Sequence, residues 1–163
     1  MKKYAASFGL VTLAATIACN GDGSAPRVTN PTPLATVGAS TNVSIRPSII
    51  TAQAVNQPSC PLVPPFVGSL GVDIQAVDFP LSLSRVQMTF IDSAGLSAPT
   101  VTLPAPVLTR QFGSTLVEAR SGRTFPFTFP FGCNTRRTGQ LVVVIVINDR
   151  DGQETKEMRV PVR

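Results

Sequence analysis

Residues 141–154 read LVVVIVINDRDGQE and carry the strongest structural signal in the chain. An unbroken apolar run at 141–147, most of it β-branched, is typical of a strand that is buried on both faces. The Asp and Gly residues of 149–152 then predict a tight turn into a second strand. Because both faces of the first strand are apolar, its outer face needs cover. That cover comes either from the chain's own proline-rich loops or from a docked partner protein.

A second informative stretch, residues 124–131, reads TFPFTFPF. In a strand, its phenylalanines share one face, whereas Pro126 and Pro130 lie on the other. Proline has no N–H to donate, so the side of the backbone that holds both prolines cannot form a complete ladder. This predicts an edge strand. A row of phenylalanines without a polar handle is more often core than a ligand platform, and we favour the core interpretation.

Shorter apolar or alternating runs fill the rest of residues 43–163, and turn signals separate them. No helical periodicity lasts for three turns, so the sequence predicts an all-β domain. The expected strands lie near residues 43–50, 66–77, 85–91, 100–110, 115–118, 124–131, 140–147 and 153–162. This number of short strands fits a β-sandwich.

Two of these runs are similar to segments of a known fold. RVQMTFIDSAG at residues 85–95 and LVVVIVINDRDGQE at 141–154 resemble the C strand and the F–G hairpin of bacterial immunoglobulin-like domains. The resemblance spans most of residues 43–163 and implies an immunoglobulin-like antiparallel β-sandwich. It implies a fold and not an activity, because folds of this kind host many unrelated roles.

The N-terminal residues have the pattern of an export signal. Lys2 and Lys3 precede an apolar stretch at residues 5–18 that is too short to span a bilayer, which predicts a signal peptide over residues 1–18. The tetrapeptide Thr-Ile-Ala-Cys at 16–19 resembles a bacterial lipobox, and the resemblance implies that Cys19 receives a diacylglycerol. Ordinary signal-peptidase cleavage at the same bond is the alternative. Residues 19–42 are predicted to form a flexible tether. Together, the signal peptide, the lipobox-like tetrapeptide and the tether predict a membrane-anchored lipoprotein of the bacterial cell envelope. In a double-membraned host, Asn20 after the cysteine favours the outer membrane.

The cysteine count supports this interpretation. An exported protein with three cysteines leaves one unpaired unless that one has another role, and lipidation gives Cys19 such a role. Cys60 and Cys133 are then expected to form a disulfide in an oxidising compartment. In an immunoglobulin-like topology both would lie at one end of the sandwich, just before strands that run in the same direction. Two free thiols, or a pair of catalytic thiols, are the alternatives.

The sequence also lacks much catalytic chemistry. It contains no His, which removes Ser-His-Asp and Cys-His catalysis, and no nucleotide-binding motif. We therefore expect no enzyme activity, no cofactor and no metal. Asp73 and Asp78 would lie on opposite faces of a strand, which argues against a glycosidase pair. Carboxylates at 149, 151 and 154 could bind calcium, but a hairpin turn explains them more simply.

Charge excludes one more class of partner. Removing Lys2 and Lys3 from the 14 basic side chains leaves 12 against 9 acidic ones, a net charge of +3. This charge is too small and too scattered for binding to nucleic acid.

Four arginines on loops beside the phenylalanine-rich strand are the candidate partner-binding residues. If they gather, they could meet anionic polysaccharide or lipid headgroups, and the alternative is that they are solvated turn residues. The expected function is adhesion, scaffolding or assembly through contacts with an envelope protein, and the alternative is a surface carbohydrate-binding module. The four candidates are Arg120, Arg123, Arg136 and Arg137.

Overall fold

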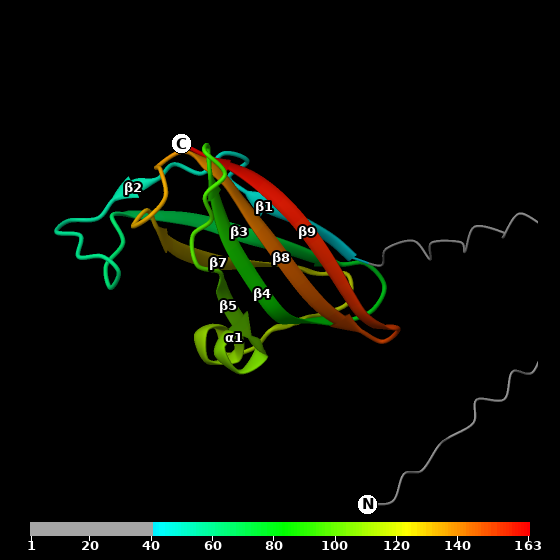
Figure 1. The fold of residues 1–163 in the computed structure, drawn as a ribbon. Helices are drawn as coiled ribbons and strands as arrows, with labels where there is room; N and C mark the ends of the chain where they lie inside the picture. The colour runs from blue at the N-terminus through cyan, green and yellow to red at the C-terminus, as the bar shows by residue number, and fades with distance from the viewer. Residues whose placement is uncertain (1–40) are drawn as a thin grey trace, which may run out of the picture. The chain divides into compact units, whose positions relative to one another are not determined.

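The structure is a computed structural model, and it describes residues 41–163 (Figure 1). Cys19, the predicted signal peptide and most of the predicted tether therefore lie outside the described residues. Strands dominate, and the first one begins two residues before the predicted start of the domain. The elements in chain order are β1 (Thr41–Arg46), β2 (Gln53–Ala54), β3 (Phe66–Ala76), β4 (Leu81–Asp92), β5 (Val101–Pro104), α1 (Ala105–Phe112), β6 (Leu116–Val117), β7 (Gly122–Phe131), β8 (Gly139–Asp149) and β9 (Gly152–Val162).

The strands form two antiparallel sheets that lie face to face. In the first sheet, β3 is central, with β1 and β2 on one side and β7 on the other. In the second sheet, β5 and β6 pair with one side of β4, and β8 and β9 follow on its other side. Figure 1 shows β4, β8 and β9 in front of β3 and β7. The prediction of an all-β antiparallel sandwich is confirmed.

The phenylalanine-rich strand is an edge strand, as its prolines predict. β7 pairs with β3 alone, in a continuous register from Phe66 opposite Phe131 to Gln75 opposite Gly122. Pro126 lies opposite Gly71 and Pro130 opposite Val67 in this register. A proline is tolerated at an edge strand where its missing N–H would have pointed to solvent and not to the neighbouring strand. All four phenylalanines of the row are at most 2% exposed and lie between the sheets. The core interpretation of this row is confirmed.

The outer face of β8 is only partly buried, and no proline-rich loop is among the register neighbours of its valines. Val146 is 1% exposed, and Val142 and Val144 are half-buried. The register places polar side chains beside these valines on both neighbouring strands, whose aliphatic parts can cover apolar surface. These neighbours are Arg85, Gln87 and Thr89 on β4 and Thr155, Glu157 and Arg159 on β9.

The predicted strand at residues 100–110 is wrong in its second half. β5 ends at Pro104, and the chain continues into α1, which has Pro106 in its first turn, where no N–H is needed. The helix buries Leu108, and the ring of Phe112 packs edge-on against Phe125 of β7 at 5.2 Å between centroids. Helical spacing places both of these side chains on the same face of α1.

The two long edges of the sandwich are closed in different ways. On one edge the chain leaves β1 and crosses to the second sheet, where Ile50 pairs in parallel with Val162 of β9. The N–H of Ile50 donates to Pro161 O at 2.9 Å. On the other edge, the seam between β5 and β7 is filled by α1 over part of its length. The part of the seam that α1 does not fill extends to the end of the sandwich where Cys60 and Cys133 lie.

The two ends of the sandwich carry different loops. β1 begins at the end that also holds the β3–β4 turn and the β8–β9 hairpin, which we call the near pole. The opposite end, the far pole, holds loops 55–65, 93–100 and 132–138. In Figure 1 the loops of the far pole extend from the left, beside β2, to the top of the view, and the β8–β9 hairpin of the near pole lies on the right.

Candidate functional site

A disulfide joins two of the loops at the far pole. Cys60 in loop 55–65 is bonded to Cys133 in loop 132–138, and their Cα atoms are 5.6 Å apart. The two cysteines lie just before β3 and β8, at one end of the sandwich. The predicted pairing of Cys60 with Cys133 is therefore present in the structure.

A pocket of about 270 Å³ opens beside this disulfide. It continues the seam between β5 and β7 beyond the end of α1, so its walls come from both sheets and from all three loops. Most of its lining is proline or aliphatic carbon. The main lining residues are Pro61, Leu62 and Pro64 from the first loop, Pro99 and Val101 at the start of β5, and Pro130 and Phe131 at the end of β7.

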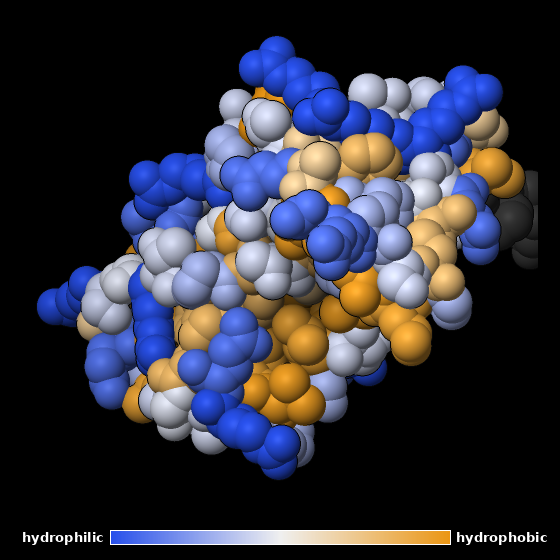
Figure 2. Space-filling model, turned by 90° about the vertical axis from the view of Figure 1, so that its left-hand side faces the viewer, coloured by the Kyte–Doolittle hydropathy of each residue, from blue (hydrophilic) through white to orange (hydrophobic). Residues whose placement is uncertain are grey.

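Apolar side chains stand in solvent around this pocket. Leu62, which lines it, is 87% exposed, and Val63 and Leu96 at the same pole are also exposed. Figure 2 views the molecule from the far pole and shows hydrophobic side chains reaching the surface among hydrophilic ones. Aliphatic side chains held in water next to a pocket are typical of a contact surface for another molecule.

The carboxylate of Asp92 holds the second and third loops together. Its Oδ1 accepts the N–H groups of Ala94 at 2.8 Å and Leu96 at 2.9 Å, and its Oδ2 accepts the N–H of Arg136 at 2.8 Å. The N–H of Arg136 is the main reason why the pKa of Asp92 lies below its usual value, with burial opposing the shift. This contribution to stability is present above the ordinary carboxyl pKa of about 4 and is lost in stronger acid.

The pocket is therefore fixed from two directions. The disulfide ties loop 55–65 to loop 132–138, and Asp92 ties loop 93–100 to the same loop. A site whose walls are held before binding loses less conformational entropy when a partner docks.

The four candidate arginines do not gather, so that hypothesis is corrected. Arg120 and Arg123 lie at the start of β7, whereas Arg136 and Arg137 follow its end. β7 has 10 residues, and at about 3.3 Å per residue its ends lie roughly 30 Å apart. Residues close in sequence were separated because an extended strand runs between them.

The roles of the first two arginines differ. The guanidinium of Arg123 donates to Phe112 O at 3.0 Å and to Leu116 O at 3.3 Å, and it lies over the ring of Phe125. These contacts hold the end of α1, so Arg123 is structural. Arg120 is exposed in the turn before β7, at the near pole.

The other two arginines lie at the far pole in loop 132–138, and neither is among the residues that line the pocket. Arg137 donates to Ala52 O at 2.7 Å and lies over the ring of Phe66. The side chain of Arg136 is exposed. Both follow Asn134 and Thr135, which line the pocket. Loops 55–65 and 93–100 contain no charged residue, so these two arginines are the only charged residues of the three far-pole loops.

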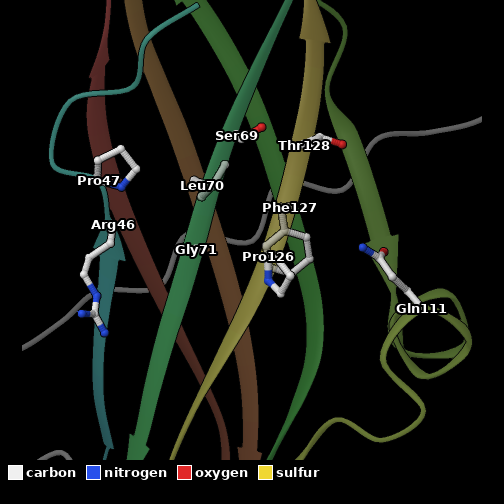
Figure 3. Close-up of a pocket in the computed structure, with 9 residues that line it drawn as sticks. All are labelled: Arg46, Pro47, Ser69, Leu70, Gly71, Gln111, Pro126, Phe127 and Thr128. Atoms are coloured by element: carbon white, nitrogen blue, oxygen red, sulfur yellow. The ribbon is translucent and has the colours of Figure 1, made fainter.

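A second hollow lies on the outer face of the first sheet (Figure 3). It measures about 400 Å³ and crosses β3 and β7 between Arg46 and Gln111. Gly71 in its floor leaves room that a side chain would take, since a Cβ there would lie 3.1 Å from Thr124 Cγ2. The hollow is shallow, and no aromatic ring on it faces solvent, because Phe127 is buried.

Asp73 beside this hollow has no free oxygen for catalysis. One oxygen accepts the Nε–H of Arg46 and the other accepts the hydroxyl of Thr124. These hydrogen bonds, led by that of Arg46, lower the pKa of Asp73. Asp78 is exposed in the turn after β3. The two carboxylates do not form a pair across a cleft.

The acidic residues after β8 form a turn, as the sequence predicts. Asp149 Oδ1 accepts the N–H of Asp151 at 2.8 Å and that of Gly152 at 3.0 Å. Within residues 41–163, no cluster of His, Cys, Asp or Glu side chains has an arrangement that could hold a metal ion. The same residues include no helix with the length and hydrophobicity needed to cross a bilayer.

Comparison with known proteins identifies solved structures whose fold is similar to that of this chain. No family model matches the chain, and no curated protein matches it. The solved structure of Northeast Structural Genomics Consortium target SoR45 is similar, with a TM-score of 0.52 and 12% identity over 76% of this chain and 88% of that chain. A structural-genomics target from Bordetella pertussis gives a TM-score of 0.47 and 12% identity, with 76% of this chain and 88% of that chain covered. At this identity the likeness concerns the fold alone.

Proposed function

We propose that this chain is a non-catalytic, exported lipoprotein whose β-sandwich binds another envelope protein through the far pole, in adhesion, scaffolding or assembly. The observation that carries the proposal is the preorganised apolar pocket, with Leu62 87% exposed on its wall. An aliphatic side chain held in water gains free energy when a partner covers it, at about 25 cal/mol per Å² of apolar surface.

The chemistry of the exposed side chains favours a protein over a carbohydrate. Sugar-binding sites commonly stack a sugar on an exposed aromatic ring. Among the described residues, the large hydrophobic side chains that are exposed are all Ile, Leu or Val. Aliphatic side chains and prolines offer packing surface for other side chains, which suits a protein contact.

The path of the chain also supports a role in contacts beyond the membrane. The predicted tether leads into β1, which begins with Thr41 at the near pole. A domain tethered there has its pocket at the opposite end, where an anchored module can reach a partner.

The proposed anchor predicts the chemistry of the mature N-terminus. Cells that produce the chain should yield a protein that begins at a diacylated Cys19 and sediments with membranes. Replacing Cys19 with Ser should release the protein into the soluble envelope fraction, because no lipid can be attached. Intact-mass analysis and fractionation measure both results. An unmodified Cys19 in a released protein would overturn the anchor and leave the contact proposal standing.

The contact itself can be tested by photo-crosslinking in producing cells. A photoreactive residue at position 62 should give a discrete adduct with one envelope protein. The matched control is position 116, because Leu116 is also an exposed leucine, 44% exposed, but lies away from the pocket lining. Equal labelling at both positions, or none at position 62, would contradict the proposal. Binding on a glycan array without an adduct at position 62 would favour the carbohydrate alternative.

A further inference from the structure

We infer that the disulfide between Cys60 and Cys133 is a redox switch for the far-pole pocket: its reduction frees one wall of the pocket and leaves the sandwich folded. This inference rests on the proposed function and names a way in which the contact at the far pole is regulated. Three observations carry it. They are the few ties of loop 55–65, the separate ties of the other two loops, and the exposure of Cys60.

The tip of loop 55–65 is joined to the sandwich by the disulfide. Residues 56–63 are all exposed. The N–H of Ser59 donates to Val63 O at 2.9 Å, the N–H of Val63 donates to Ser59 O at 2.8 Å, and the N–H of Val55 donates to Pro65 O at 2.9 Å. In the described part of the chain, every hydrogen bond of this loop lies inside the loop. The disulfide is therefore the one bond that fixes the tip to another loop.

The other walls of the pocket are held without the disulfide. The carboxylate of Asp92 joins loop 93–100 to loop 132–138, and the N–H of Ser93 donates to Thr138 O at 2.9 Å. Pro130 and Phe131, which also line the pocket, belong to β7 and are fixed by its pairing with β3. Breaking the disulfide therefore releases only the wall that loop 55–65 forms.

The disulfide is open to exchange in the folded protein, because Cys60 is exposed. Exposed disulfides are those commonly used in regulation, and the reductant that fits is a dithiol protein of the envelope. Its first thiolate bonds to Cys60 Sγ, and Cys133 leaves as a thiolate that takes up a proton. The second thiol of the reductant then releases Cys60 as a thiol. Two electrons and two protons pass to the chain, and the dithiol becomes a disulfide.

Reduction changes how well the pocket can bind. The tip carries Pro61 and Leu62 of the lining, and a free tip samples many conformations. A partner that covers Leu62 must then order the loop as it docks, which weakens the contact. The oxidised protein is the form that binds.

The first test asks whether the bond opens without unfolding. The mature protein is treated with dithiothreitol, below the melting temperature of the reduced form, and its thiols are alkylated and counted by mass. The reduction rate without denaturant should be within about tenfold of the rate in concentrated urea, because a thiolate reaches Cys60 directly. Circular dichroism should show that the strands persist. A native rate slower by about a hundredfold or more would overturn the inference.

The second test locates the part of the chain that reduction frees. NMR order parameters of the Leu62 and Val63 amides should fall from about 0.85 to below about 0.6 on reduction. The amides that Asp92 accepts, those of Ala94, Leu96 and Arg136, should keep their values. The matched control is the double variant Cys60→Ser/Cys133→Ser, which should resemble the reduced protein and ignore dithiothreitol. Unchanged values at positions 62 and 63, or an equal fall at all five amides, would overturn the inference.

The third test separates the switch from the proposed function. In producing cells, the photoreactive residue at position 62 should give about tenfold less adduct when both cysteines are serine. Equal adduct with and without the disulfide would leave the contact standing and overturn its redox control. If position 62 gives no adduct in either protein, the proposed function fails. The NMR result then decides whether the disulfide controls the pocket wall.

Discussion

Replacing Gly139 with alanine is expected to destabilise the domain severely, because the strand next to it leaves no room for a methyl group. A Cβ at this position would lie 2.2 Å from Ile91 O and 2.6 Å from Asp92 Cα. Both are backbone atoms of β4, so no side-chain rotation relieves the overlap, and the end of the β4–β8 ladder must open. We expect a loss of about 3 kcal/mol in the free energy of unfolding, the upper end of the usual cost of overpacking. Urea unfolding followed by circular dichroism measures it.

Gly122 provides the matched control for this prediction. It is also the first residue of a long strand, but a Cβ there would meet Gln75 Cγ at 3.4 Å, an ordinary contact with a flexible side chain. Gly122→Ala should therefore change the unfolding free energy by less than about 1 kcal/mol. Equal unfolding midpoints for the two variants would show that β4 and β8 do not approach each other as described. The Asp92 anchor at the far pole would then need a different geometry as well.

The second large effect is expected from the double variant Cys60→Ser/Cys133→Ser. The disulfide closes a loop with a sequence separation of 73. In the chain-entropy model, a loop of this length stabilises the folded state by about 4 kcal/mol. For a domain of this size, losing it should lower the melting temperature by roughly 15 °C. Changing both cysteines avoids leaving a free thiol, and differential scanning calorimetry gives the result.

Reduction of the wild-type protein is the independent check on this prediction. A reducing agent should lower the melting temperature of the wild type to that of the double variant and leave the variant unchanged. If the wild type shows two reactive thiols before reduction, the pairing of Cys60 with Cys133 is wrong. If the variant melts at the wild-type temperature, the disulfide contributes little to stability, and loop 55–65 is held by other contacts.

The strands were predictable because their signals are local. The apolar run of β8, the Asp and Gly residues after it, and the prolines of β7 each act within a few residues of their own position. Side chains alternate between the two faces of a strand, so the phenylalanines at every second position of β7 all point to the same face, which in a sandwich is the inner one. The pairing of Cys60 with Cys133 followed from counting, since only two cysteines remained once Cys19 had another expected role.

The parts that sequence reasoning missed depend on distant contacts. α1 is only 8 residues long, and it forms because Leu108 and Phe112 fill the seam beside β7, which no local pattern reveals. The spread of the four arginines follows from the length of β7. The far-pole pocket joins three loops, and its one local sign is the uncharged, proline-rich stretch PSCPLVPP at residues 58–65.

The far pole is the surface that we propose to meet a partner protein. Hydrogen–deuterium exchange of the mature protein, alone and with the partner captured at position 62, tests this most directly. Bound partner should slow exchange at residues 58–65, 93–101 and 130–137 and leave the near pole unchanged. Slower exchange confined to the outer face of the first sheet around Gly71, or to the β8–β9 hairpin, would contradict the proposed interface.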